Sequence, residues 1–287
     1  MKSVALQYED GSLRSVAMNP VRNVIGSREL LWSLAQRELR TKYRGSFLGW
    51  TWSMLNPLAT LAIYGFVFGI LFGAQAPVGE NSGLTGFAWF LLCAIIPWNF
   101  FAVVNNIGLT AITSNSGLVR RVAFPRETLV FSNVLFALVQ FAIELVVLSA
   151  VLLIVAGAPI LPWIPVAALL GILLAVFASG IGLTLSALAV YFKDLTYLWA
   201  ITLQVWFLIT PVVYPPSVVE AQLPTWAQNL LRANPMVHFV GGFRDLLYHA
   251  QMPGLDRIGA MLSSAAFSLV AGWLLFHRLS PRLPEEV

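Results

Sequence analysis

The sequence predicts an all-α integral membrane protein with six transmembrane helices. A cytoplasmic amphipathic interface helix precedes them, and short re-entrant helices are expected on the outer side before the last span. Two observations carry this prediction. Hydrophobic residues make up 58% of the 287 residues and charged residues only 10%, a composition that lipid must solvate. Six apolar segments also reach the length of about 20 residues that a helix needs to cross a bilayer.

The six segments are separated by connections that mostly leave no room for a soluble domain. They lie at approximately 50–72, 87–109, 129–156, 164–191, 195–213 and 258–276. The third and fourth are joined by residues 157–165, where three prolines and a glycine end one helix and begin the next. A catalytic domain of about 100 residues is therefore not expected beside the spans.

Lysine and arginine are distributed unequally between the two sides. With six spans both termini share one side, and 14 of the 17 cations fall there, 8 of them in the N-terminal tail. The opposite side holds Arg232 and Arg244, with Arg257 at a boundary. The positive-inside rule therefore predicts that both termini are cytoplasmic.

The long outer connection before the last span contains more apolar residues than a solvated loop needs. Pro224 and Pro235 interrupt short apolar groups between about 214 and 250. This pattern predicts two short amphipathic helices that dip into the outer interface. A small extracellular cap packed on the helix ends is the alternative.

The segment before the first span is strongly basic. At 100° per residue, Arg37, Arg40 and Arg44 fall on one arc, which predicts an amphipathic helix in the cytoplasmic interface, within residues 27–48. Three arginine forks on one face suit a phosphate or pyrophosphate head group. The alternative is that these cations only fix the topology and contact anionic lipid.

Aromatic side chains accumulate around the first and fifth spans. Such residues are common at membrane boundaries, but stacked aromatic faces can also line a sugar pathway without tight binding. The sequence leaves both interpretations open. The pathway candidates are Tyr43, Trp50, Trp52 and Tyr64 on the first side and Trp199 and Trp206 on the other.

A short basic connection, about 114–127, joins the second and third spans. Serine and asparagine residues form a possible helix cap, a basic turn follows, and Pro125 ends it. Apolar residues among arginines suggest that a soluble partner covers this segment. Ordinary anchoring at the interface is the alternative.

The sequence contains no motif for catalysis, metal binding or nucleotide binding. None of the lysines, Lys2, Lys42 and Lys193, follows a glycine, so a Walker A loop is excluded. No catalytic residue, metal site or nucleic-acid partner is predicted. Glu144, near the middle of the third span, either serves a proton pathway or is protonated and hydrogen-bonded between helices.

Five motifs in a fixed order resemble the permease subunit of type-2 ABC exporters, most closely those of O-antigen, capsule, teichoic acid and cell-wall galactan. They lie at 30–58 (LLWSLAQRELRTKYRGSFLGWTWSMLNPL), 117–127 (GLVRRVAFPRE), 191–195 (YFKDL), 209–219 (ITPVVYPPSVV) and 234–248 (NPMVHFVGGFRDLLY). The resemblance covers about residues 27–287. Lys193 stands where members of the family often carry arginine, which keeps the charge.

The resemblance implies a homodimer that works with two separate ABC ATPase subunits. ATP and Mg²⁺ then belong to those subunits, and this chain holds no cofactor. The implied ATPase contacts are Leu118, Arg120, Arg121, Phe124, Pro125, Arg126 and Glu127. The expected parts are a cytoplasmic tail at 1–26 without an assigned role, a gate helix at 27–48, the transmembrane domain at 49–278 and a cytoplasmic tail at 279–287.

The function implied is ATP-driven export of a lipid-linked polysaccharide or polyol-phosphate polymer across a bacterial inner membrane. The lipid head group would bind Arg37, Arg40 and Arg44, and the polymer would cross a channel at the dimer interface. An exporter of drugs or small lipids with the same architecture is the alternative. A secondary transporter is less favoured, because Glu144 is the one charge in the middle of a span.

Overall fold

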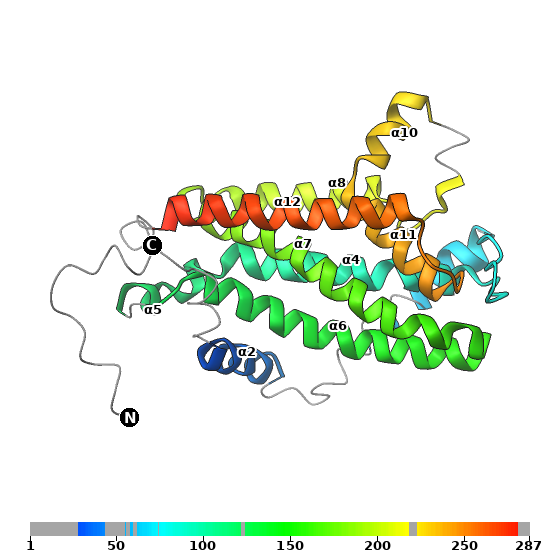
Figure 1. Cartoon of the computed structure of the whole chain (residues 1–287), viewed down its shortest axis with the longest axis horizontal. Helices are drawn as coiled ribbons and strands as arrows, with labels where there is room; N and C mark the ends of the chain where they lie inside the picture. The colour runs from blue at the N-terminus through cyan, green and yellow to red at the C-terminus, as the bar shows by residue number, and fades with distance from the viewer. Residues whose placement is uncertain are drawn as a thin grey trace.

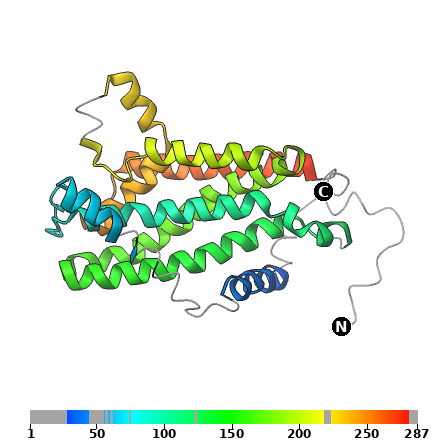
Figure 2. The ribbon, with the colours of Figure 1, turned by 180° about the vertical axis from the view of Figure 1, so that it is seen from behind.

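The computed structural model describes residues 28–43, 55, 58–59, 62–73, 75–121, 124–217 and 223–280. In these ranges the regular structure is entirely helical. Long helices run side by side along the longest axis of the molecule, and α2 (Arg28–Tyr43) lies beside α6 (Glu127–Ala156) (Figures 1 and 2). This agrees with the predicted all-α class.

Four helices of the described ranges are long and apolar enough to cross a membrane. They are α4 (Phe87–Thr110), α6, the segment Pro159–Tyr191 that contains α7 (Ile164–Tyr191), and α12 (Leu255–Leu279). Two shorter apolar helices, Ala62–Leu71 and α8 (Leu195–Ile209), lie where the first and fifth spans were predicted. The protein is therefore a multi-pass membrane protein, and the count of six spans stays a prediction.

The helix boundaries follow local backbone chemistry. At Gly157 the backbone adopts φ +77°, a conformation that favours glycine, and its N–H bonds to the Leu153 carbonyl to end α6. A 3₁₀ turn, η5 (Ala158–Trp163), leads into α7. The helix α8 ends at Ile209, earlier than the predicted 213, because Thr210 precedes Pro211 and is extended.

The centre of the bundle is held by glycines on α7. A Cβ at Gly180 would overlap the Ser268 carbonyl on α12, and one at Gly272 would overlap the Gly180 carbonyl. On the α4 side, a Cβ at Gly108 would lie 3.2 Å from the Cα of Gly182. Such small residues let helix backbones approach closely. Close packing matters here because the hydrophobic effect does not bring helices together in lipid.

Two short helices, α10 (Thr225–Arg232) and α11 (Pro235–Leu247), lie in the predicted outer connection, and Pro224 and Pro235 begin them as expected. Their entry into the bilayer stays a prediction. α11 is packed into the core, whereas α10 has no buried residue and projects from the bundle (Figure 1).

A buried arginine fixes α11 to its neighbours. Arg244, only 3% exposed, donates to the carbonyls of Phe90, Pro211 and Val212 and lies over the Phe90 ring at 3.6 Å. At the end of α11 the Tyr248 hydroxyl donates to carbonyls of the loop before α4. We call this end of the bundle the α11 end and the opposite one, where α5 (Ser116–Arg121) lies, the α5 end.

Candidate functional site

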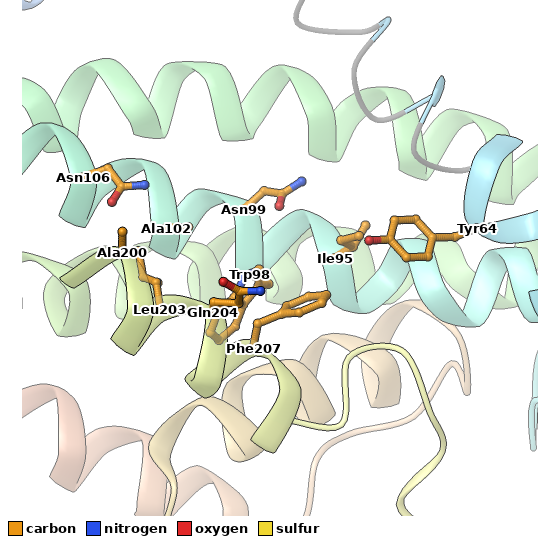
Figure 3. Close-up of a pocket in the computed structure, with 10 residues that line it drawn as sticks. All are labelled: Tyr64, Ile95, Trp98, Asn99, Ala102, Asn106, Ala200, Leu203, Gln204 and Phe207. Atoms are coloured by element: carbon orange, nitrogen blue, oxygen red, sulfur yellow. The ribbon is translucent and has the colours of Figure 1, made fainter. Parts of the chain in front are cut away.

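An open groove runs along the bundle between α4 and α8. Its volume is about 550 Å³, within the range of about 300–1,000 Å³ that is usual for ligand pockets. Tyr64 lies at one end, and the small side chains of Ala102 and Ala200 lie toward the other end, near Asn106 (Figure 3). The lining residues are Tyr64, Ile95, Trp98, Asn99, Ala102, Asn106, Ala200, Leu203, Gln204 and Phe207.

A smaller cavity of about 160 Å³ lies on the other side of the same α4 residues, against α6. It shares Asn99 and Asn106 with the groove and adds Gln140 and Glu144. The amide Nε2 of Gln140 donates to Glu144 Oε1 over 3.0 Å. Glu144 is therefore hydrogen-bonded within its own helix, beside a strip of polar side chains.

Three amides of the groove are not among the charged and aromatic residues predicted from the sequence to line a pathway. Asn99 and Asn106 are seven residues apart, so they share a face of α4, and Gln204 stands opposite on α8 (Figure 3). The available signal was asparagine and glutamine at helical spacing within apolar spans, where polar side chains are expensive.

The predicted pathway aromatics take different positions. Tyr64 lines the groove and stacks on Phe68 with ring centroids 5.8 Å apart. Trp206 is half-buried, and its Nε1 donates to Asn234 Oδ1 over 2.8 Å. Trp199 is 7% exposed and meets the Trp206 ring edge-on at 6.4 Å. Neither tryptophan lines the groove, and their rings contact each other.

Five of the predicted pathway and head-group residues cannot be placed by their side chains. Arg44, Trp50 and Trp52 lie outside the described residues, and of Arg40 and Tyr43 only the backbone in α2 is described. Arg37 is described. Its Nη2 donates to Asn115 Oδ1 over 2.8 Å and to Glu38 Oε1 over 2.9 Å. The first candidate head-group arginine therefore connects α2 to the segment that begins α5.

The predicted coupling segment forms the turn η4 (Thr113–Asn115) and the six-residue helix α5. Arg120 and Arg121 are exposed at its end, while Val119 is buried. Leu118 and Phe124 pack against the core cluster at this end of the bundle. α5 therefore presents two cations outward while its apolar side chains hold it in place.

The last two residues of the coupling segment contact α12. The Arg126 guanidinium donates to the carbonyl and, over 3.3 Å, to the hydroxyl of Ser280. Burial lowers the pKa of Arg126, and the neighbouring Glu127 carboxylate partly offsets this. Glu127 is buried, with His277 Nε2 4.0 Å from its Oε1. Pro125, half-buried, separates these contacts from α5.

Within the described ranges, no three histidine, cysteine or acidic side chains come together as metal ligands. The features that remain are a polar and aromatic groove and a small basic helix at one end of the bundle. Together they suit movement of a solute through the membrane more than its chemical conversion.

Comparison with known proteins decides the family. The family model of the ABC-2 type transporters matches residues 29–248, a range that runs from α2 to the end of α11. This chain belongs to the ABC-2 type transporter family.

Several curated relatives match this ABC-2 transporter over most of their length. The O-antigen export system permease protein RfbA of Myxococcus xanthus is 32% identical over 93% of this chain and 98% of the relative. A Klebsiella pneumoniae protein of the same name is 25% identical over 90% and 94%. The polysialic acid transport protein KpsM of Escherichia coli is 28% identical over 83% and 87%.

Proposed function

We propose that this chain is the membrane permease subunit of an ATP-driven exporter of a lipid-linked polysaccharide or polyol-phosphate polymer. The observation that carries the proposal is the family match, together with relatives named for O-antigen export and polysialic acid transport. The groove supports it, since amide and aromatic side chains suit a hydroxyl-rich chain with apolar ring faces.

The permease works as a homodimer in a bacterial inner membrane, with both termini cytoplasmic and two ABC ATPase subunits that bind ATP and Mg²⁺. The exposed Arg120 and Arg121 on α5 support a docking site for the ATPase. Leu118, Phe124, Arg126 and Glu127 make internal contacts that support a positioning role for them instead.

The lipid phosphate binds the three arginines Arg37, Arg40 and Arg44, of which the first two belong to α2. Because Arg37 already donates to Asn115, a phosphate bound there competes with this hydrogen bond. Head-group binding then loosens α2 from the segment that carries α5. The polymer follows the aromatic path of the first span, Tyr43, Trp50, Trp52 and Tyr64, opposite the side of Trp199 and Trp206.

Deletion of the gene tests the export function directly. Without the chain, the surface polymer is lost and its lipid-linked form accumulates inside the cell, and the wild-type gene restores both. Surface polymer at the normal level, with a changed sensitivity to drugs, would instead establish the small-molecule exporter.

Purification tests the partner. A Walker-motif protein is expected to co-purify with the wild-type chain and to be released by Arg120→Glu with Arg121→Glu, because both charges at the contact are reversed. Arg278→Glu reverses another exposed cation at the α5 end, on α12, and should retain the partner. Export by a chain that never associates with an ATPase would support a secondary transporter.

A further inference from the structure

Three amide side chains of the groove have no hydrogen-bond partner among the described residues. Asn99, Asn106 and Gln204 make no hydrogen bond within the part of the chain that the structure describes. Their neighbour Asn105 contrasts with them, because it is buried and its Nδ2 donates to the Phe101 carbonyl over 2.8 Å. Asn105 thus pairs its Nδ2 inside the bundle, although its Oδ1 has no partner among the described residues, whereas the three groove amides pair neither atom there.

Unpaired amides at membrane depth require a polar environment. Asn99 lies twelve residues into α4, or about 18 Å along its axis, and Asn106 lies about 10 Å further. Lipid offers an amide no hydrogen bond, so such groups face a water-filled cavity or a polar ligand. Asn106 and Gln204 are exposed on facing helices of one groove, which places that cavity between α4 and α8.

We propose that Asn99, Asn106 and Gln204 bind the sugar hydroxyls of the exported polymer as it passes through the groove. This inference rests on the proposed function. An amide both donates and accepts, as a hydroxyl does, and it carries no charge that would hold one unit tightly. Three such amides give several weak binding sites, and weak sites allow a substrate both to enter and to leave.

The apolar walls complete the match to a sugar chain. Tyr64, Trp98 and Phe207 line the same groove, and the Trp98 and Phe207 rings lie 5.4 Å apart. The face of an aromatic ring can cover the apolar face of a sugar ring, while the polar end of a tyrosine or tryptophan side chain stays hydrated. The ligand class is therefore a neutral, polyhydroxylated chain. A drug-like apolar molecule would leave the three amides unpaired, which is costly.

Cysteine labelling tests whether the groove holds water. Cys93 is the single cysteine of the chain and is fully buried, so Cys93→Ala provides a background. Asn106→Cys and Gln204→Cys should react with a charged, membrane-impermeant thiol reagent about tenfold faster than Val146→Cys. Val146 is 66% exposed on α6 but lines neither cavity. Equal rates would mean that lipid or protein fills the groove, and the proposal would be wrong.

Export by substituted chains tests the hydroxyl contacts. Asn106→Leu keeps the size but removes the hydrogen bonds, and should lower the polymer export rate about fivefold; Asn99→Leu with Gln204→Leu should lower it further. Asn106→Gln should restore most of the rate. Chain abundance and Tm monitor folding, and the labelling test stands if the leucine variants do not fold.

The two proposals fail in different ways. If the deleted strain exports polymer normally, the proposed function is wrong. If deletion blocks export but the leucine variants export at the wild-type rate, the export function stands and the assignment of the three amides is wrong.

Discussion

The two sides of α4 differ in how they are packed. Gly108 faces α7 so closely that a Cβ would lie 3.2 Å from Gly182, whereas Asn106, two residues earlier, is exposed on the groove. Two residues correspond to about 200° around a helix, so one helix carries a sealed face and an open face. The sealed face, that of Gly108, packs on α7 and sets the position of the helix backbone. The open face, that of Asn106, is not constrained by packing, so its side chains can serve a ligand.

Breaking the sealed face should have the largest effect. Gly272→Ala places a Cβ against the Gly180 carbonyl, so α7 and α12 must move apart at an expected cost of about 1–3 kcal/mol or more. We expect a lower Tm in detergent and less chain in the membrane. Gly259→Ala is the control, because a Cβ there meets nothing within 4 Å. Equal Tm values for the two variants would contradict the close packing.

The next effect is expected where Arg244 closes the α11 end. Arg244→Met removes the donor to three buried carbonyls, which should lower the free energy of unfolding by about 1–3 kcal/mol. Arg244→Lys keeps the charge without the planar fork, so its Tm should lie between those of Arg244→Met and wild type. A lysine variant as stable as wild type would show that charge alone suffices.

Filling the open face should affect transport without affecting stability. Ala200 lines the groove and is exposed, so Ala200→Phe adds a ring to free space. We expect the free energy of unfolding to change by no more than about 0.5 kcal/mol, so Tm should change little. Polymer export should fall about tenfold. Leu169→Phe, at an exposed position of α7 outside the groove, should change neither. A large fall in Tm for Ala200→Phe would mean that the groove is packed.

The features predicted correctly from the sequence are those that depend on local patterns along the chain. Apolar runs located the four long helices, and prolines located the starts of α10 and α11. The Arg37–Asn115 and Arg126–Ser280 hydrogen bonds join residues 78 and 154 positions apart, and no periodicity reports such pairs. The groove amides were overlooked because an uncharged amide in an apolar run hardly changes composition.

The smallest effect is expected for the hydrogen bond between α2 and η4. Arg37 was predicted from the sequence to bind the lipid head group, and the structure bonds it to Asn115. Since the donor is charged but exposed, loss of this hydrogen bond should lower the free energy of unfolding by about 1 kcal/mol.

A double-mutant cycle of Arg37→Ala and Asn115→Ala, with export rate as the measurement, separates the two roles of Arg37. If Arg37 acts through Asn115, the second substitution adds little to the first, because neighbours that share a contact are not additive. If Arg37 acts by binding phosphate alone, Arg37→Ala reduces export several-fold in either background, and α2 does not communicate with α5 through this bond. Thr113→Ala changes a nearby side chain whose hydroxyl donates to the Thr110 carbonyl over 3.2 Å and not to Asn115, and should add independently to Arg37→Ala.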